Sequence, residues 1–356
     1  MNIRSVKFDR LTSEELATWS AIQLGNEVYS SPYFRPEFTQ AVAAVRDDVE
    51  VAVLEESGRA VGFLPFQRTP WNGGRPIGGR LSDYHALIAG PDVLCEPVEI
   101  VRACRLSSWH FDHLVAAHPS FTRYAWSFAE SPYIDVSDGF EAYMRQRGNT
   151  RGVMSEYGQK KRKLEREIGP VRYERHVADR AVLATLIEWK SEQYRRTKVD
   201  NIFAFPWVIN LLEQIMQFDS PHIAPIMSVT YCGDQIAAIN FGMRAGTVLH
   251  PWFPAYNVDF GKYSPGTLHW VATLQDAEDM GVKRIDLVSG GETYKQRFSS
   301  GTIRVAQGAI DPRPSLAAAR RAWRRTREIV RSSPVYSRVR GPVRMLHNVK
   351  AWLELR

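Results

Sequence analysis

The sequence SPGTLHWVATLQDAEDMGVKRIDLVSGG, residues 264–291, decides which fold this chain is expected to adopt. Ser264 suits an N-cap and Pro265 suits the first helical position, since both are favoured at helix starts. Gly281 is expected to end the helix after Met280. The apolar residues at helical spacing are Leu268, Val271, Ala272, Leu274 and Ala277. The segment predicts a helix followed by a strand over residues 283–289.

A three-stranded meander is predicted immediately before this helix. Residues 227–231 and 236–242 flank a turn at Gly233, and residues 247–253 add a third strand. Because the first amides of a helix are unpaired and lie at the positive end of its dipole, a helix start can bind phosphate. The order meander, helix, strand favours the pyrophosphate of CoA as the ligand; an ordinary capped helix is the alternative. The predicted cofactor-binding residues are Ser264, Pro265, Gly266, Thr267 and Leu268.

A similar hairpin is predicted in the first half of the chain. Residues 49–54 and 60–66 flank a turn at Gly58, which lies 175 positions before Gly233 in a chain of 356 residues. We therefore expect an α/β fold of two tandem modules with mixed, mostly antiparallel sheets flanked by helices, although two similar hairpins can arise by chance. The expected divisions are an N-terminal module (1–145), a basic linker helix (146–170), a C-terminal module (171–312) and a basic helical tail (313–356).

Composition indicates a globular protein with its basic charge concentrated at one end. Apolar residues make up 44% and charged residues 24%, and no apolar run is long enough to span a bilayer. Three cysteines at unrelated spacings favour a reducing compartment, so a cytoplasmic protein is expected. Residues 313–356 contain twelve basic and two acidic residues, whereas the rest of the chain carries 34 basic and 37 acidic ones.

An ordered set of short motifs resembles the Fem-like branch of the GNAT superfamily, specifically the CelD-type acetyltransferases associated with cellulose and other exopolysaccharides. The late strand departs from the family's Arg-Gly-like end, because this chain has Ser289-Gly290-Gly291 there. The matching motifs are Ser31-Pro32-Tyr33-Phe34, Glu37-Phe38, Val61-Gly62-Phe63-Leu64-Pro65, Leu81-Ser82-Asp83-Tyr84-His85, the basic helix from Lys160 to Leu164, Ser264-Pro265-Gly266, and Asp286 through Gly290 to Tyr294-Lys295.

The resemblance implies two GNAT-like modules and transfer of an acyl group from acetyl-CoA or another acyl-CoA, without a metal. The implied acceptor is an amine or hydroxyl of a small or lipid-linked sugar, such as an amino sugar or an envelope or exopolysaccharide precursor. Two rivals remain open. One is a Fem-type transferase that uses aminoacyl-tRNA, and the other is a catalytically degenerate scaffold protein.

Candidate catalytic residues follow the late strand. By analogy with GNAT enzymes, Tyr294 is a candidate general acid toward the CoA sulfur, or a packing aromatic. Lys295 is expected to stabilise an oxyanion or bind an acceptor phosphate, or to lie exposed. Asp286 lies within an apolar strand and needs a partner, so it is expected to act as a base or to anchor Lys295 or Arg297. Arg297 and, as a weaker candidate, Glu292 on the intervening turn are predicted to bind the acceptor.

A second group of candidates, Asp83, Tyr84 and His85, follows a Gly-Gly turn in the first half. An Asp beside a His offers hydrogen bonds to an acceptor, and the imidazole can act as a base near neutral pH. The alternative is a hydrogen-bonded turn without a catalytic role. We therefore predict His85 as a catalytic residue and Asp83 and Tyr84 as acceptor-binding residues.

The basic segments allow several partners. Residues 159–167 predict either a solvated linker helix or a cationic wall beside an anionic substrate. The basic tail suits an anionic membrane surface, an acidic carrier protein, or packing on the body; nucleic acid is not the expected partner. Peripheral contact with the inner face of the membrane would suit a lipid-linked acceptor.

Several other classes are disfavoured by the sequence. His110, His113 and His118 with Cys104 lack the paired spacing of a zinc site. The chain contains no Walker loop, no dinucleotide-binding glycine fingerprint and no nucleophile elbow. ATPase, dehydrogenase and serine-hydrolase activities are therefore not expected.

Overall fold

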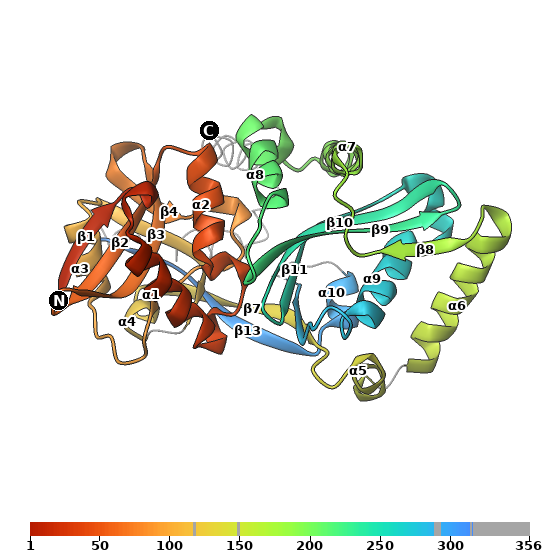
Figure 1. The fold of residues 1–356 in the computed structure, drawn as a ribbon, viewed down its shortest axis with the longest axis horizontal. Helices are drawn as coiled ribbons and strands as arrows, with labels where there is room; N and C mark the ends of the chain where they lie inside the picture. The colour runs from red at the N-terminus through yellow and green to blue at the C-terminus, as the bar shows by residue number, and fades with distance from the viewer. Residues whose placement is uncertain (117–118, 148–149, 288–292, 314, 316–356) are drawn as a thin grey trace, which may run out of the picture.

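A computed structural model describes residues 1–116, 119–147, 150–287, 293–313 and 315. One mixed sheet runs through the length of the molecule, with helices on both faces (Figure 1). Its strand order is β1-β2-β3-β4-β6-β13-β7-β12-β11-β10-β9-β8, and β5 pairs with β3 beside this path. The predicted α/β architecture with a mixed, mostly antiparallel sheet is confirmed.

The predicted N-terminal hairpin is formed by β2 and β3. Its two-residue turn places Ser57 and Gly58 in the left-handed region, at φ values of 51° and 80°, as a hairpin that matches the strand twist requires. The strands of this half are β1 (Asn2–Val6), β2 (Val49–Glu56), β3 (Arg59–Thr69), β4 (Gly73–Pro76), β5 (Ile88–Ala89), β6 (Ser108–Val115) and β7 (Ala125–Asp135).

The predicted meander is formed by β9, β10 and β11, joined by tight turns at Gly233 and Gly246, both with positive φ. Strand β12 is shorter than the predicted strand, since within the described residues it covers only three positions. The strands of this half are β8 (Val171–Glu174), β9 (Ile223–Cys232), β10 (Gln235–Ala245), β11 (Val248–Tyr256), β12 (Arg284–Asp286) and β13 (Gly301–Ile310).

The two halves exchange strands at the centre of the sheet. Strand β13 lies between β6 and β7, and β7 also pairs with β12, with Ile134 opposite Ile285. Strand β13, the last strand among the described residues, thereby completes the sheet of the first half. The two modules are continuous through hydrogen bonds rather than joined only by a linker.

Helices cover both faces of the sheet. The start of α1 has a capping box, because Thr12 accepts from the amide of Glu15 and the Glu15 carboxylate accepts from the amide of Thr12. The α-helices are α1 (Ser13–Leu24), α2 (Pro36–Val45), α3 (Pro97–Ala103), α4 (Pro119–Thr122), α5 (Phe140–Gln146), α6 (Thr150–Glu167), α7 (Arg180–Thr197), α8 (Pro206–Met216), α9 (Pro265–Asp276) and α10 (Thr293–Phe298). Short 3-10 turns are η1 (Phe8–Arg10), η2 (Glu27–Tyr29), η3 (Pro32–Phe34), η4 (Pro70–Asn72), η5 (Gly79–Leu81), η6 (Ile202–Ala204) and η7 (Val258–Tyr263).

Helix α6 confirms that the basic linker is helical, and α9 confirms the helix after Pro265, although its α-helical part ends at Asp276 rather than Met280. The predicted tail helix lies outside the described residues.

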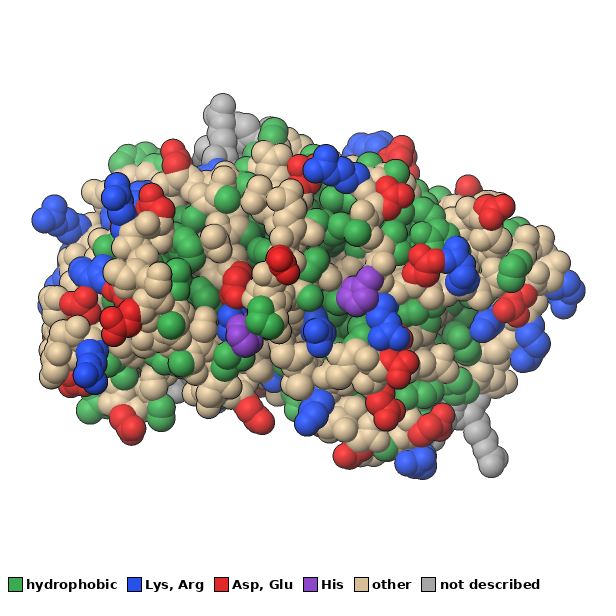
Figure 2. Space-filling view, in the orientation of Figure 1, with side chains coloured by type: hydrophobic (Ala, Val, Ile, Leu, Met, Phe, Trp, Pro, Cys, Tyr) green, Lys and Arg blue, Asp and Glu red, His purple; other side chains and the backbone are tan. Residues whose placement is uncertain are grey.

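Within the described part, no helix is both long and apolar enough to cross a membrane. On the face shown in Figure 2, acidic and basic side chains are interspersed, as the nearly balanced charge outside the tail leads us to expect.

The largest apolar core spans both modules. It combines Tyr33 and Phe38 from the first half with Leu211, Phe241 and Phe253 from the second, all buried. Helices α2 and α8 also pack against each other across this boundary. The modules therefore share a core and are expected to unfold together.

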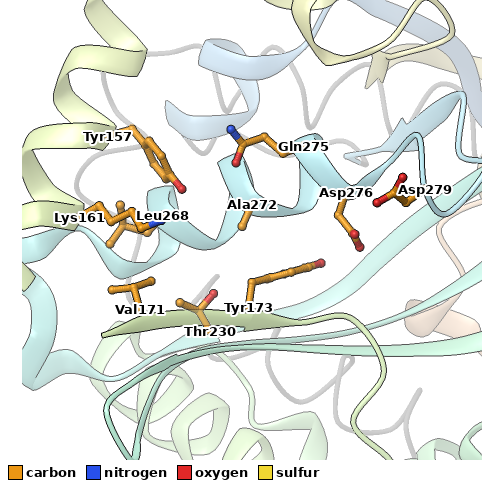
Figure 3. A pocket seen from close by; sticks show the side chains of 10 residues that line it. All are labelled: Tyr157, Lys161, Val171, Tyr173, Thr230, Leu268, Ala272, Gln275, Asp276 and Asp279. Carbon is orange, nitrogen blue, oxygen red and sulfur yellow. The ribbon is translucent and has the colours of Figure 1, made fainter. Parts of the chain in front are cut away.

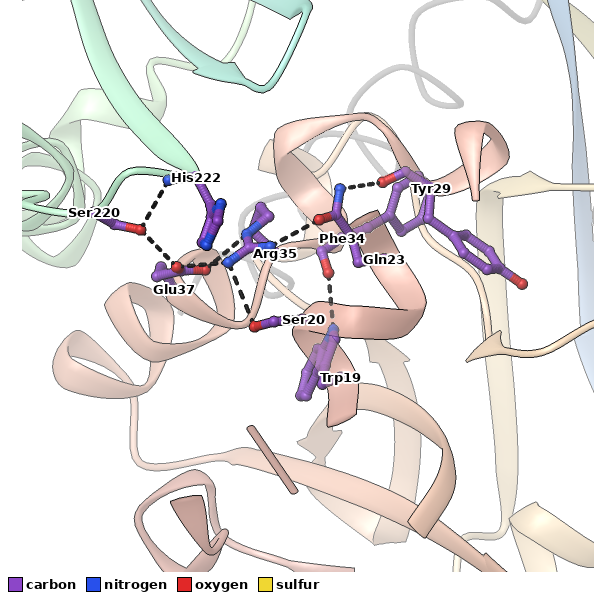
Figure 4. Close-up of polar contacts among 9 residues, drawn as sticks. All are labelled: Trp19, Ser20, Gln23, Tyr29, Phe34, Arg35, Glu37, Ser220 and His222. Carbon is purple, nitrogen blue, oxygen red and sulfur yellow. Dashed lines mark hydrogen bonds and ion pairs between the residues drawn. The ribbon is translucent and has the colours of Figure 1, made fainter. Parts of the chain in front are cut away.

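A buried ion pair connects the modules beside this core (Figure 4). Arg35 is 1% exposed and holds Glu37 with two bonds, Nε to Oε2 at 3.0 Å and Nη2 to Oε1 at 2.8 Å. Its Nη1 donates to Gln23, and Ser220 of the second module donates to Glu37 at 2.9 Å. Although burial acts to raise the pKa of Glu37, the hydrogen bonds from Arg35 keep it below its ordinary value.

Replacement of Arg35 by Ala is expected to lower the free energy of unfolding by about 3–5 kcal/mol, because it leaves Glu37 with an uncompensated charge in a largely buried place. Urea unfolding followed by circular dichroism measures the change. Arg195→Ala is the control, since its pair with Glu192 has side chains 69% and 52% exposed, and the expected loss is under about 0.5 kcal/mol. Equal losses in the two variants would contradict the bridging role of Arg35.

A second buried polar group is His269, which α9 directs toward β9. Both ring nitrogens of His269 have hydroxyl partners, Ser228 Oγ at 3.0 Å and Thr230 Oγ1 at 2.9 Å. Burial lowers the pKa of His269 from 6.5 to about 4. The folded protein therefore keeps this imidazole neutral over a pH range in which the unfolded chain protonates it.

Protonation of His269 in the unfolded state predicts an acid-side loss of stability. Above pH 6.5 neither state binds this proton, and between pH 6.5 and about 4 only the unfolded state does. The free energy of unfolding therefore decreases as the pH is lowered through this range, by up to ~3 kcal/mol. Unfolding free energies at about pH 7 and about pH 5 should show a smaller pH dependence in His269→Gln than in the wild type. Identical pH dependence would refute the neutral assignment.

Candidate functional site

Strand β11 separates from β12 after two residue pairs. The two strands are parallel neighbours only at Val248–Arg284 and Leu249–Ile285, whereas β11 continues to Tyr256. The register against β10 shifts between Phe241 and Gly242, so β11 carries a bulge that bends it. Beyond this point, the edge of β11 that faces β12 has no strand partner among the described residues.

Glycine is required opposite the bulge. A Cβ added to Gly242 would collide with the carbonyl oxygen of His250, because the bulge brings the two backbones together. Two prolines, Pro251 and Pro254, follow in β11 and cannot donate backbone hydrogen bonds. Proline is tolerated at an open strand edge, so the sequence of β11 agrees with its separation from β12.

The start of α9 offers fewer free amides than the sequence led us to expect. Pro265 is the first helical residue as predicted, but Ser264 has a φ of 55° and its side chain makes no capping bond. The amides of Thr267 and Leu268 both donate to the carbonyl of Ser264, at 3.0 and 3.1 Å. Because proline has no N–H, the amide of Gly266 remains as the available donor in this first turn.

Space for a ligand remains next to Gly266. A Cβ added there would meet only Tyr256 Cδ1, at an ordinary contact distance of 3.8 Å. Pro265 and Leu268 are buried, whereas Gly266 and Thr267 are half-buried. The five predicted cofactor-binding residues therefore form one accessible helix end rather than a row of free amides.

Three polar side chains meet where η3, the loop after η5 and β11 come together. Tyr33 Oη donates to Asp83 Oδ2 at 3.1 Å and lies 3.0 Å from His250 Nε2. Nε2 also lies 3.1 Å from the same carboxylate oxygen. Because a carboxylate accepts hydrogen bonds, this arrangement assigns the imidazole proton to Nε2. The other ring nitrogen, His250 Nδ1, is buried and has no hydrogen-bond partner among the described residues.

Asp286 lies next to this group and is fully buried. Its Oδ1 accepts from Arg284 Nε at 2.9 Å, while Oδ2 has no hydrogen-bond partner within the described residues. Burial raises the pKa of Asp286, although the nearby charges of Arg284 and His250 act in the opposite direction. Arg284 also donates to Ser30 Oγ at 3.0 Å, which ties β12 to the N-terminal module.

The structure thus brings together three predicted residues from both halves of the chain, Asp83, Tyr84 and Asp286. Tyr84 is buried, its hydroxyl lies 2.7 Å from Ser131 Oγ, and burial together with the charge of Asp286 raises its pKa well above 10.0. Sequence reasoning missed Tyr33 and His250 as functional candidates. The available signal for His250 was a lone imidazole in an otherwise apolar predicted strand.

His85 lies apart from this cluster. Its Nε2 accepts from the amides of Asp112 and His113, both at 3.3 Å, and its ring packs edge-on against Trp109. Burial lowers the pKa of His85 to about 4. The arrangement holds a neutral imidazole in the interior of the first module, which favours the structural alternative for His85 over a shared role with Asp83.

The remaining predicted residues lie on or near α10. Arg297 Nη2 donates to Glu156 Oε2 of α6 at 2.7 Å, so its partner is not Asp286. Lys295 is buried, with 7% of its surface exposed. The Tyr294 side chain and all of Glu292 lie outside the described residues. The described residues contain no group of three or more His, Cys, Asp or Glu side chains arranged to hold a metal ion.

Comparisons with known proteins identify a similar domain family and similar folds. Residues 151–296 match the family model of the acetyltransferase (GNAT) domain. No curated protein sequence matches the chain. Among solved structures, FemX is similar with a TM-score of 0.56 and 10% identity, over 90% of this chain and 99% of that chain.

Two further structures show the same likeness. A tandem GNAT protein from the clavulanic acid biosynthesis pathway has a TM-score of 0.51 and 9% identity, over 88% of this chain and 99% of that one. The C-terminal domain of a putative lysylphosphatidylglycerol synthetase from Agrobacterium fabrum has a TM-score of 0.52 and 12% identity, over 86% and 94%. At such identities the likeness shows the fold alone. The chain shares its fold with tandem GNAT structures, and residues 151–296 are similar to the GNAT acetyltransferase domain.

Proposed function

We propose that this protein transfers an acyl group from acyl-CoA to an amine or hydroxyl acceptor, with the donor bound where β11 separates from β12. The separation is the observation that carries the proposal, because it leaves a strand edge open beside the start of α9. The donor's pyrophosphate would lie at Gly266, where the helix dipole favours negative charge.

A cavity at the end of β11 supports an amino-sugar acceptor. Its volume is about 220 Å³, and it lies between α7 and residues 255–259. Trp189 supplies an aromatic surface, and Glu192 and Asp259 supply carboxylates, while Arg196 also lines the cavity. Because residues 255–259 begin about 16 Å along β11 from His250, these groups would hold a part of the acceptor remote from the reacting nitrogen. An amino sugar offers both an apolar ring face and a cationic nitrogen. Precursors of exopolysaccharides, as in CelD-type enzymes, are acceptors of this class.

The Tyr33–Asp83–His250 cluster would supply the base. An acceptor amine attacks the thioester carbonyl carbon, a C–N bond forms and the C–S bond breaks. His250 Nδ1 takes the proton from the nitrogen, because Asp83 fixes the other ring proton on Nε2. The CoA sulfur leaves as a thiolate and takes a proton, for which Tyr294 is the candidate donor by its resemblance to GNAT enzymes.

A Fem-type transferase that uses aminoacyl-tRNA is the second candidate. The start of α9 favours this candidate over a CoA-dependent enzyme in one respect. Two of its amides already donate to Ser264, so a single amide remains to bind the pyrophosphate of CoA. Calorimetric titration with acetyl-CoA and with aminoacyl-tRNA separates the two candidates. Binding of neither would support a scaffold protein.

Gly266→Ala tests the donor site. The added methyl group fits the folded protein, so the unfolding free energy should change by less than about 1 kcal/mol. It would occupy the space next to the free amide, so the affinity for acetyl-CoA should fall by at least about tenfold. Gly90→Ala, whose Cβ would meet only Val93 at 3.9 Å, is the matched control. An unchanged affinity for acetyl-CoA in Gly266→Ala would show that the pyrophosphate does not bind at the start of α9.

Substitutions in the cluster test the base. His250→Gln should lower kcat for acetyl transfer to glucosamine by about 10²–10⁴, the usual contribution of a general base. Tyr33→Phe should have a smaller effect, because Asp83 still holds the imidazole. Release of free thiol from acetyl-CoA measures the rate.

Tyr29→Phe is the control for loss of a buried hydroxyl, since Tyr29 donates to the Ala89 carbonyl at 3.2 Å, away from the cluster. Equal losses in Tyr29→Phe and His250→Gln would show that the effect is structural.

A further inference from the structure

A second cavity, separate from the β11 opening, lies between α6 and α9 above β8 and β9 (Figure 3). Its volume is about 280 Å³, enough for roughly nine water molecules at ~30 Å³ each. Apart from Leu268, none of the residues assigned to donor, acceptor or catalysis lines it. The cavity therefore has no role in the proposed transfer reaction.

The two ends of this cavity differ in charge. Lys161 of α6 lies at one end, and Asp276 and Asp279 of α9 lie at the other (Figure 3). Arg175 pairs with both carboxylates, at 2.7 and 3.5 Å, so one negative charge at this end remains uncompensated. At the opposite end, the closest carboxylate to Lys161 is Glu165, at a loose 4.0 Å.

Only one of the two carboxylate oxygens of Asp276 has a hydrogen-bonding partner among the described residues. Arg175 holds Oδ1, while Oδ2 is buried and has no hydrogen-bond partner among the described residues. Burial raises the pKa of Asp276, in spite of Arg175. A buried carboxylate oxygen without a donor is costly, and an ammonium group in the cavity would supply the missing hydrogen bond.

The walls between the two ends are suited to an apolar stem. Tyr157 of α6 and Tyr173 of β8 lie on different sides of the cavity, and Val171 and Ala272 add aliphatic surface (Figure 3). Thr230 also lines the cavity, but its hydroxyl is bonded to His269 and is not directed to a ligand. Polar recognition is thus confined to the two ends.

We propose that the α6–α9 cavity binds a small zwitterion whose ammonium group lies at Asp276, whose carboxylate lies at Lys161, and whose apolar stem lies between Tyr157 and Tyr173. Along α9, Leu268 and Asp276 are separated by about 12 Å of helix rise, so the ligand's charges are well separated rather than borne on one carbon. Only Lys161, among the lysines of the basic helix, faces the cavity.

6-Aminohexanoate is a suitable probe, with hexylamine and hexanoate as analogues that each lack one charge. Methyl NMR of the full chain reports binding directly through Val171, Leu268 and Ala272. A Kd on the order of 1 mM is expected for 6-aminohexanoate, with weaker binding of hexylamine and the weakest binding of hexanoate. No shift of these methyl signals at about 50 mM probe, or equal binding of hexanoate, would overturn the proposal.

Two variants locate the charges. Asp276→Asn should raise the Kd for 6-aminohexanoate by at least about tenfold without unfolding the protein, because it removes a desolvated charge. Lys161→Ala should weaken the binding of 6-aminohexanoate but leave the affinity for hexylamine unchanged. Asp259→Asn, in the cavity near α7, is the matched control, and an effect equal to that of Asp276→Asn would refute the assignment. Because no measurement uses acyl-CoA, the outcome is independent of the proposed transferase activity.

Discussion

The bend in β11 is the constraint on which the functional part of the molecule depends. The absence of a side chain at Gly242 lets the β11 backbone approach β10 at His250, and the register between the two strands shifts at this point. Among the described residues, β12 ends at Asp286, so it pairs with β11 only at Val248 and Leu249. The edge of β11 beyond Leu249 therefore has no strand partner among the described residues.

The strand exchange between the modules determines what lies beside that opening. Because β13 inserts between β6 and β7, the first module is held against β12 and β11. Asp83 and Tyr33 then lie within hydrogen-bond distance of His250. Burial of the His250 imidazole and the Tyr33 phenol costs desolvation energy, which the shared apolar core offsets.

Much of the fold could be predicted from local patterns. The hairpin turns at Gly58 and Gly233 and the helix after Pro265 depend on neighbouring residues and are confirmed. The strand exchange was not predicted, because the pairing of β13 with β6 joins residues almost 200 positions apart and leaves no local signal. Helix α9 ends at Asp276 because residues 277–280 form a turn rather than a further turn of α-helix. The spacing of apolar residues does not distinguish these two conformations.

Two signals predicted residues of the site: Asp83 and Tyr84 follow a Gly-Gly turn, and Asp286 conflicts with its local pattern. Asp286 stood out as a carboxylate in an apolar strand, and the structure places it fully buried with one oxygen lacking a partner among the described residues. His85 was a candidate because it lies beside Asp83 after the Gly-Gly turn. Two backbone amides satisfy its Nε2, whereas its Nδ1 is buried without a hydrogen-bond partner among the described residues. A sequence shows that a buried polar group needs a partner, but only the fold shows whether the partner is backbone, another side chain, or a missing ligand. By that criterion His250 Nδ1, Asp286 Oδ2 and Asp276 Oδ2 have the strongest claim to a function, because each is buried without a hydrogen-bond partner among the described residues and lies beside an opening or a cavity.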